Sequence, residues 1–294
     1  MKADSAAGRF FHAYCESKIA AVAALSLALL IALALFAPWI SPQNPYDLAA
    51  LDILDARLPP GEKSWEGTIT YPLGTDGQGR DMLSAILYGL RISIGIGAIS
   101  TLIALALGVS LGLLAGYKAG WVEALIMRIA DIQLSFPAIL LALILLAFIR
   151  PGVGNIVLAL VAVQWAYYAR TTRSAALVER QKEYIEAAVG LGLSPARIVF
   201  RHLLPNCLPP VIVVAALQIA AAISLEATLS FLGMGVPVTE PSLGLLIANG
   251  SQYLMSGNYW ISIFPAIALL LTIASINLVA DRLRDVLNPR SQPY

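Results

Sequence analysis

Charged residues are scarce in this sequence. Asp, Glu, Lys and Arg make up 13% of the 294 residues, and 59% of the residues are hydrophobic. Soluble domains average about 25% charged and about 45–50% apolar residues. The composition therefore excludes an ordinary soluble domain and predicts a protein with several membrane spans.

Cysteine and histidine are also rare, with two of each. Cys15 and Cys207 lie on or near the same side of the membrane in the topology that the charges predict, and they indicate neither a disulfide framework nor a metal cluster. His12 lies in the N-terminal tail. His202 is better suited to helix capping or interface packing than to proton chemistry. The sequence assigns no definite role to Cys15, Cys207 or His202.

Nucleotide-binding motifs are absent. No Gly-x-x-x-x-Gly-Lys-Ser/Thr sequence occurs, and Gly77-Gln78-Gly79 does not extend to Gly-x-Gly-x-x-Gly. No constellation of His, Asp, Glu, Ser or Lys at one membrane depth is visible either. We therefore expect no catalytic residue, no metal site and no cofactor on this chain, and nothing indicates a nucleic-acid partner.

Long uncharged runs are abundant. Residues 19–40 form an uncharged run of 22 residues, which is enough to cross about 30 Å of hydrocarbon. The run is too long for a cleaved signal peptide and ends without a clear cleavage site, so we interpret it as a retained first span. Five further spans are predicted at residues 92–117, 122–149, 153–169, 211–232 and 259–280. The predicted fold class is an all-α polytopic membrane protein with six transmembrane helices.

Polar segments separate the spans. Residues 1–18 and 281–294 are tails, and residues 233–258 form an external segment. Residues 41–91 form a long proline-bearing external loop, with a turn at 73–81 that caps a short helix. Residues 92–280 form the core with the other five spans. Within the core, Gly108, Gly112 and Gly116 share one helix face and predict close helix packing, and Phe136-Pro137 predicts a kink.

The distribution of Lys and Arg predicts the orientation. With the N-terminus inside, the outer segments carry five of these residues, namely Arg57, Lys63, Arg80, Arg91 and Arg150, and the inner segments carry the remaining 14 of the 19. Lys and Arg concentrate in cytoplasmic loops of membrane proteins. We therefore expect both termini, and the polar stretch between the fourth and fifth spans, to be cytoplasmic.

That polar stretch, residues 181–206, organises the chain. Residues 181–189 favour a helix, and Gly190 and Gly192 interrupt it because glycine is costly inside helices and permits turns closed to other residues. Ser194-Pro195 then predicts a restart, with Ser as N-cap and Pro in the first turn. We expect this second helix to end before Pro205.

The same stretch resembles the EAA loop of ABC-importer permeases. That pattern is Glu-Ala-Ala, three residues, Gly, nine residues, Ile, any residue and Leu-Pro. Its counterparts at the expected spacing are Glu186, Ala187, Ala188, Gly192, Leu204 and Pro205. His202 stands where the general pattern has Ile, and the ending His-x-Leu-Pro-Asn resembles the dipeptide/oligopeptide/nickel branch.

Other segments resemble the second, C-type permease of that branch, so that the resemblance covers most of the chain. One is the Leu-Gly-Thr-Asp turn at 73–76, which is followed after two residues by Gly79-Arg80-Asp81. The others lie in the C-terminal half, at residues 230–233, 264–265, 283–285 and 288–289.

The resemblance implies a type I ABC importer permease in a bacterial inner membrane. Its EAA loop would lie in a cleft of an ATPase subunit and couple nucleotide-driven closure to opening of the pore. The implied partners are a second permease, two ATPases that hold ATP and Mg²⁺, and an extracytoplasmic binding protein that docks on residues 41–80 and 233–258. Peptides are the implied cargo, but nickel chelates, opines and oligosaccharides leave no distinguishing mark in the sequence.

Three polar residues are candidates for a pathway or gate. At about 1.5 Å per residue, Gln164 and Gln218 lie deep in the fourth and fifth spans, where interhelical hydrogen bonding is an equally good interpretation. Glu226 lies near the outer boundary, and a carboxylate in a span usually faces protein or water. A stand-alone secondary transporter or channel is the alternative class, but it would need such charges along several spans and an inverted repeat.

Overall fold

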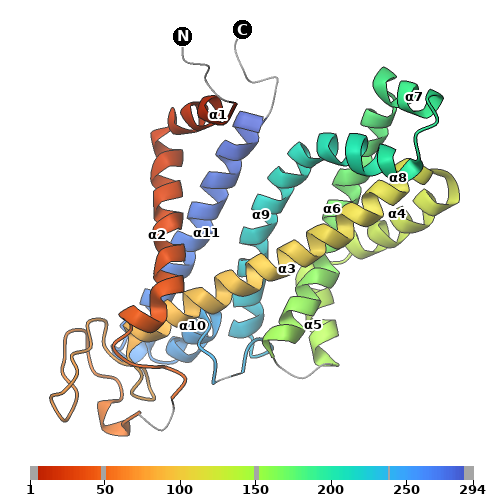
Figure 1. The fold of residues 1–294 in the computed structure, drawn as a ribbon. Helices are drawn as coiled ribbons and strands as arrows, with labels where there is room; N and C mark the ends of the chain where they lie inside the picture. Colours follow the sequence, from red (N-terminus) through yellow and green to blue (C-terminus); the bar gives the residue numbers. More distant parts are fainter. Residues whose placement is uncertain (1–5, 48–50, 149–151, 238, 288–294) are drawn as a thin grey trace.

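The computed structural model describes residues 6–47, 51–148, 152–237 and 239–287, and these residues form helices without a named strand. The short helix α1 (Ala6–Cys15) precedes the upright α2 (Lys18–Ile40). The helix α3 (Met82–Lys118) runs diagonally across the molecule, and α11 (Trp260–Leu287) stands beside α2 (Figure 1).

The centre of the chain forms the rest of the bundle. The helices α4 (Gly120–Leu134), α5 (Ala138–Ala147) and α6 (Val153–Arg180) precede the short α7 (Glu183–Gly190) and α8 (Pro195–Arg197). A π-helical turn (Ile198–Leu203) then leads into α9 (Leu204–Phe231). The helix α10 (Leu243–Ser251) packs against α9 and α11. Two 3₁₀ turns, Ile53–Asp55 and Leu254–Ser256, lie in the connecting segments.

Helices occupy the positions of all six predicted spans. Four of them are long and apolar enough to cross a membrane, namely α2, α3, the continuous helix Pro195–Phe231 and α11. The pair α4 and α5 makes a fifth candidate, bent by 92°. The helix α6 has 28 residues but is less apolar, because it contains Asn155 and Gln164 and is charged from Arg170 onward.

The kink predicted at Phe136-Pro137 is confirmed in position, and two predicted helix boundaries were wrong. The kink at Phe136-Pro137 is a complete break between α4 and α5, because Pro137 lies at the N-cap of α5. The predicted short helix after Asp81 and the second span are one continuous helix of 37 residues. The fifth span starts before Pro209 and Pro210, which both lie inside α9.

The glycine face of α3 packs against α6, as predicted. A Cβ atom at Gly108 would lie 2.4 Å from the carbonyl oxygen of Trp165, and one at Gly112 would lie 2.6 Å from that of Ala169. Such contacts are possible only without side chains, so they bring the two backbones together where lipid offers no hydrophobic drive for association. The α3–α6 pair is therefore a closely packed unit.

Buried polar contacts order the long loop at 51–81. The Asp55 carboxylate accepts hydrogen bonds from the Tyr71 hydroxyl and the Trp65 amide, both at 2.7 Å. The Asp81 carboxylate accepts from the Ser84 amide at 2.8 Å and so caps α3, as the sequence predicts. The Trp260 indole donates to the Thr75 carbonyl at 3.1 Å and joins the loop to α11.

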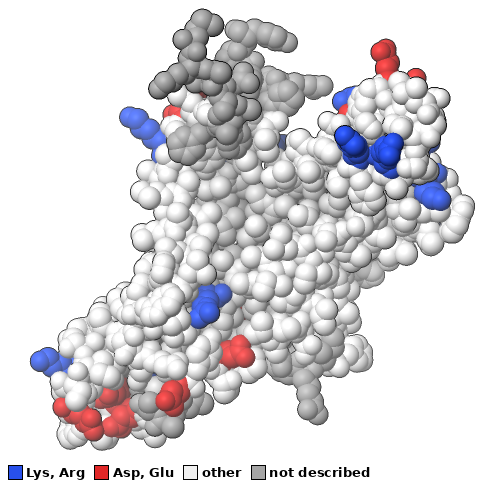
Figure 2. All heavy atoms as spheres, viewed as in Figure 1, with Lys and Arg blue, Asp and Glu red and all other residues white. Residues whose placement is uncertain are grey.

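The two ends of the molecule carry different elements and different charges. One end carries α1, the end of α11 and the turn from α7 to α8, and the opposite end carries the 51–81 loop and α10 (Figure 1). Figure 2 shows Lys and Arg gathered near the α7–α8 end and Asp and Glu gathered over the 51–81 loop. The exposed acidic residues of that loop and its approach are Asp47, Asp52, Glu62 and Glu66.

Candidate functional site

The first half of the Glu-Ala-Ala stretch lies on α7, and its three residues do not face the same way. Glu186 and Ala187 are exposed, whereas Ala188 is buried beside Ile185. Ile185 and Ala188 pack in a cluster with Ala176 of α6, Ile198, Leu203 and Cys207. Ala188 therefore seats α7 on the bundle, and Glu186 and Ala187 are the two residues of the trio that a partner can touch.

Gly192 forms the turn after α7. Its φ of +70° lies in the left-handed region, where a side chain is disfavoured. A Cβ atom there would meet no atom within 4 Å, so the backbone conformation alone calls for glycine. Gly190, which the sequence also suggests as an interruption, ends α7 without a positive φ. The predicted double-glycine hinge is thus a single turn at Gly192.

The second half of the stretch restarts at the predicted place but does not stop where predicted. Ser194 occupies the N-cap with Pro195 in the first turn, although the serine side chain makes no capping hydrogen bond. The chain then passes through the π-helical turn and continues as α9, with Leu204 and Pro205 in its first turn. Pro205 lies inside the continuous helix Pro195–Phe231, shortly after the π-helical turn. A local π-helical adjustment lets a helix continue past a residue that lacks an N–H, which explains why Pro205 does not end the helix.

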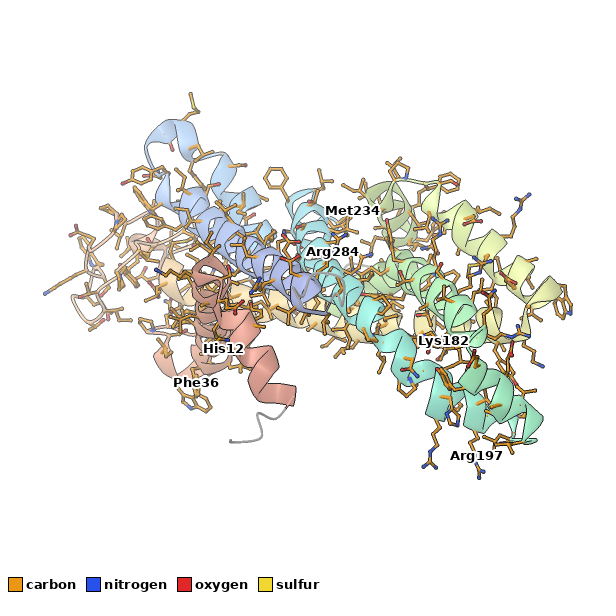
Figure 3. All side chains as sticks on the ribbon, turned by 90° about the horizontal axis from the view of Figure 1, so that it is seen from above. His12, Phe36, Lys182, Arg197, Met234 and Arg284 are labelled. Carbon is orange, nitrogen blue, oxygen red and sulfur yellow. The ribbon has the colours of Figure 1, made fainter. Side chains whose placement is uncertain are left out.

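The turn from α7 to α9 presents apolar and charged side chains together. Leu191 is 80% exposed and Phe200 is 66% exposed. Glu183, Arg197 and Arg201 of the same segment are also exposed, and Arg197 projects from the end of the molecule in Figure 3. Exposed apolar side chains rimmed by charges are typical of protein interaction sites.

A hydrogen-bonded cluster beneath α7 was missed from the sequence. The Tyr184 hydroxyl donates to the Glu179 carboxylate at 2.5 Å, and the Asn206 side-chain amide donates to the Tyr184 oxygen at 3.0 Å. Lys182 pairs with Glu179 at 2.7 Å. Burial, reinforced by the bond to Glu179, raises the pKa of Tyr184 to about 12. Burial tends to raise the pKa of Glu179, but the bonds from Lys182 and Tyr184 outweigh it and lower that pKa.

His202 and Cys207, which lie near α7, are packed against other side chains. The His202 ring lies 6.4 Å from that of Tyr184, centroid to centroid. Cys207 is buried in the cluster under α7, whereas Cys15 is exposed. Among the residues that the structure describes, no group of His, Cys, Asp or Glu has an arrangement that could hold a metal ion.

The two candidate glutamines join α6 to α9. The Gln164 amide donates to the backbone carbonyl of Gln218 at 3.2 Å, and its oxygen accepts from the Thr101 hydroxyl at 3.4 Å. Gln164 is only 3% exposed, so the interhelical bonding described above is present. Both glutamines also line a groove of about 470 Å³, together with Ala138, Ile139, Val163, Tyr167, Ala221, Ser224, Leu225 and Thr228.

Glu226 faces away from that groove. It is completely buried, and it accepts hydrogen bonds from the Ser93 hydroxyl at 2.8 Å and the Ser230 hydroxyl at 2.7 Å. Beside it, a Cβ atom at Gly244 of α10 would lie 2.2 Å from the Ala227 carbonyl oxygen. Glu226 therefore lies at the junction of α3, α9 and α10, apart from Gln164 and Gln218.

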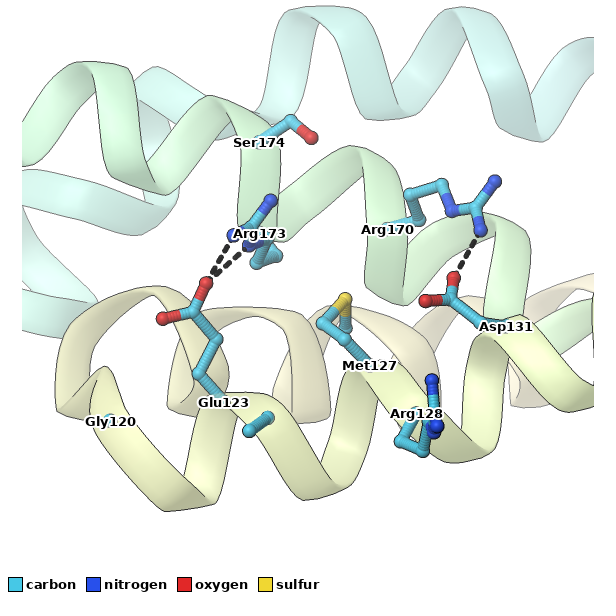
Figure 4. Close-up of a pocket in the computed structure, with 9 residues that line it drawn as sticks. Gly120, Glu123, Met127, Arg128, Asp131, Arg170, Arg173 and Ser174 are labelled. Carbon is cyan, nitrogen blue, oxygen red and sulfur yellow. Dashed lines mark hydrogen bonds and ion pairs between the residues drawn. The ribbon is translucent and has the colours of Figure 1, made fainter.

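A charged groove between α4 and α6 was also missed from the sequence. It has a volume of about 810 Å³. Arg173 bonds Glu123, and Arg170 bonds Asp131, so that two ion pairs cross it (Figure 4). Arg128 lines the same groove without an ion pair to any described residue. Helical periodicity places Glu123 and Asp131 on one face of α4, but only the packing of α4 on α6 reveals their partners.

Comparison with known proteins identifies a family. Residues 108–292 match the family described as "Binding-protein-dependent transport system inner membrane component", and residues 5–60 match "N-terminal TM domain of oligopeptide transport permease C". The similar solved structures share less than 25% of their residues with this chain, so they are evidence for the fold alone. A chain of the MetNI methionine ABC transporter in an inward-facing conformation has a TM-score of 0.59 and 22% identity, over 70% of this chain and 98% of that one.

Curated relatives match over nearly their whole length. The dipeptide transport system permease protein DppC of Escherichia coli is 41% identical over 281 residues, which are 96% of this chain and 92% of the relative. The di/tripeptide transport system permease protein DppC of Pseudomonas aeruginosa is 37% identical, over 96% and 91% of the two chains. The glutathione transport system permease protein GsiD of Pectobacterium atrosepticum is 36% identical, over 96% and 90%. By the extent of these matches, the chain belongs to the family of binding-protein-dependent transport system inner membrane components.

Proposed function

We propose that this chain is a permease subunit of an ATP-driven importer that moves di- and oligopeptides across the bacterial inner membrane. The observation that carries the proposal is the match, over 96% of this chain, to permeases named for dipeptide and di/tripeptide transport. An extracytoplasmic binding protein delivers the peptide, and separate ATPase subunits hold ATP and Mg²⁺. A second, different permease chain completes the pathway.

The coupling surface in this proposal is the exposed side of the turn from α7 to α9. Glu186 and Ala187 contact the ATPase, while Gly192 sets the turn and Leu204 and Pro205 connect it to α9. The exposure of Leu191 and Phe200 in the same segment as Glu186 supports this assignment, since exposed apolar side chains among charged ones mark protein interaction sites.

The proposed orientation has both termini and the coupling surface in the cytoplasm. The end that carries α7 also carries α1 and the end of α11 (Figure 1). Lys and Arg gather near this end and acidic groups at the other, as cytoplasmic enrichment of Lys and Arg predicts. The acidic external loop and α10 then face the binding protein.

In this proposal the pathway follows the groove between α5, α6 and α9. Gln218, Tyr167, Ser224 and Thr228 give an otherwise apolar groove polar groups along its length. Gln164 holds α6 against α9 rather than contacting solute, because its amide and its oxygen are both bonded to protein. Glu226 contributes to an outer gate.

Transport by the assembled complex tests the proposal. The permease pair, the ATPases and the binding protein are reconstituted in liposomes, and ATP-dependent uptake of a labelled dipeptide is measured. Unlabelled peptides should compete, whereas a nickel chelate, an opine and an oligosaccharide should not. Competition by one of these three instead would reassign the cargo, and uptake by this chain alone without ATP would favour a secondary transporter.

A further inference from the structure

Three helices meet at the hydroxyl group of Tyr184. Tyr184 is in the first turn of α7, Glu179 is in the last turn of α6, and Asn206 is in the first turn of α9. The hydroxyl donates to Glu179 at 2.5 Å and accepts from Asn206 at 3.0 Å. One atom therefore connects the coupling helix with both helices that line the proposed pathway.

The bond to α6 is well placed to be strong. Glu179 is 7% exposed, and hydrogen bonds to a charged group are about twice as strong as those between neutral groups. Lys182 holds the second carboxylate oxygen at 2.7 Å. Only Gln181 and Lys182 separate α6 from α7, so the short connection itself restricts the movement of α7 relative to α6.

The bond to α9 has no such covalent support. Residues 191–203 lie between α7 and the start of α9, and they include the left-handed turn at Gly192 and the π-helical turn. The Asn206 amide also donates to the His202 carbonyl of that π-helical turn at 2.7 Å. Single π-turns occur often at functional sites. The Tyr184–Asn206 bond thus connects α7 directly to α9, which the backbone joins only through residues 191–203.

The same two helices are joined again deeper in the bundle. Glu179 and Asn206 line a groove of about 590 Å³ between α6 and α9. Farther along the two helices, the Gln164 amide bonds the Gln218 carbonyl. A displacement of α7 that reaches both helices at once would therefore move them as a pair.

We propose that the Tyr184 hydroxyl is a positioning group for transport, which makes α6 and α9 move together when the ATPase displaces α7. The inference rests on the proposed function, because it takes the turn from α7 to α9 as the ATPase contact. The contact surface is the exposed side of the turn, whereas the joint that connects α7 to α6 and α9 is the Tyr184 hydroxyl with its bonds to Glu179 and Asn206. Tyr184 contacts neither peptide nor nucleotide in this assignment.

The test replaces single groups in the reconstituted complex. Tyr184→Phe removes the hydroxyl and keeps the ring. Asn206→Ala, at an exposed position, leaves the Tyr184–Glu179 bond in place and removes the bond from α9, together with the Asn206–His202 bond inside the same continuous helix. Tyr117→Phe is the matched control, since Tyr117 is a half-buried tyrosine at the same end whose ring contacts Arg180. Measured quantities are assembly of the complex, basal ATP hydrolysis, hydrolysis with loaded binding protein, and dipeptides imported per ATP.

We expect Tyr184→Phe and Asn206→Ala to assemble fully and to hydrolyse ATP at the basal rate. Peptide import per ATP should fall about tenfold in Tyr184→Phe, because a hydrogen bond to a charged group is lost, and by less in Asn206→Ala, whose bond to the tyrosine hydroxyl is neutral. Tyr117→Phe should match the wild type. A ratio of import to hydrolysis cannot fall through lower protein amount alone, so it separates coupling from stability.

Two results would overturn the inference. Full import per ATP in Tyr184→Phe would show that the hydroxyl is dispensable. If Tyr184→Phe fails to assemble, full import per ATP in Asn206→Ala would do the same for the connection to α9. Glu186→Lys separates the inference from the proposed function. If only Glu186→Lys loses coupling, the joint is wrong and the contact surface stands, and if none of these variants loses coupling, both fail.

Discussion

The hydroxyl of Ser93 donates a 2.8 Å hydrogen bond to the carboxylate of Glu226, although the two residues lie 133 positions apart. Ser93 belongs to α3, and Glu226 lies near the end of α9 that adjoins α10. Burying a carboxylate is costly unless it is fully bonded. The Glu226 carboxylate therefore stabilises the junction of α3, α9 and α10 only while the hydroxyl groups of Ser93 and Ser230 remain bonded to it.

We predict that Glu226→Gln loosens this junction. An amide keeps the shape but exchanges charged hydrogen bonds, worth about 1.5–3 kcal/mol each, for neutral ones of about 1 kcal/mol. Binding-protein-independent ATP hydrolysis should rise about fivefold, which corresponds to about 1 kcal/mol. Ser110→Ala is the control in α3, because the Ser110 hydroxyl donates to the Ala106 carbonyl of its own helix and bonds no other described residue. Wild-type transport and basal hydrolysis in Glu226→Gln would remove Glu226 from the gate.

The glycine face of α3 gives a prediction about stability. A methyl group at Gly112 would lie 2.6 Å from the Ala169 carbonyl oxygen, whereas one at Gly95 would meet nothing within 4 Å. Gly112→Ala should therefore lower the free energy of unfolding by about 1–3 kcal/mol, as overpacking does, and Gly95→Ala should leave it unchanged or slightly higher. Thermal unfolding in detergent measures both. Equal unfolding temperatures would show that α3 and α6 do not pack this closely.

Local sequence patterns were sufficient to predict helix caps, turns and packing faces, which depend on residues close together in the chain. The cap at Asp81, the turn at Gly192 and the glycine face of α3 each depend on residues a few positions apart, so periodicity and turn chemistry were sufficient. Gly190 resembles Gly192 in the sequence, and only the backbone conformation separates them.

Other features depend on contacts that no local pattern contains. Pro205 predicts a helix end, but here the π-helical turn shortly before it lets the helix continue. Tyr184 and Asn206 are 22 positions apart and become neighbours only when α7 folds back on α9. The same holds for the Arg173–Glu123 pair, whose members are 50 positions apart.

The proposed topology is testable with single cysteines after Cys15 and Cys207 are replaced. Asn44 and Met255 are exposed at the end that carries the 51–81 loop, and Met255 is 99% exposed. Cysteines there should react with a membrane-impermeant thiol reagent in intact cells, and one at exposed Gln181 should react only after the cells are opened. Gly250 is unsuitable, because a Cβ atom there would lie 2.6 Å from backbone atoms of Ile261 and Ser262. Labelling at position 181 from outside would reverse the orientation.

The coupling surface gives the last prediction, which uses Glu186 and Gly192. Glu186→Lys reverses an exposed charge on α7, and disrupting a charge pair at an interface costs about 2–5 kcal/mol. Gly192→Val puts a β-branched residue at a φ of +70°, which such residues avoid. Both variants should insert normally and leave the peptide affinity of the binding protein unchanged, because neither position lies in a span or at the external end.

Each variant should lose at least tenfold in peptide uptake. The assembled complex should lose either its ATPase subunits in a pull-down or the extra ATP hydrolysis that loaded binding protein triggers in liposomes. Gly190→Val is the matched control, because Gly190 is exposed, has no positive φ and would bring its Cβ within 4 Å of no other atom. It should retain most of the wild-type stimulation, so that a loss in Gly192→Val reflects the left-handed turn rather than added bulk. Full uptake and full stimulation in both Glu186→Lys and Gly192→Val would contradict the assignment of this surface to coupling.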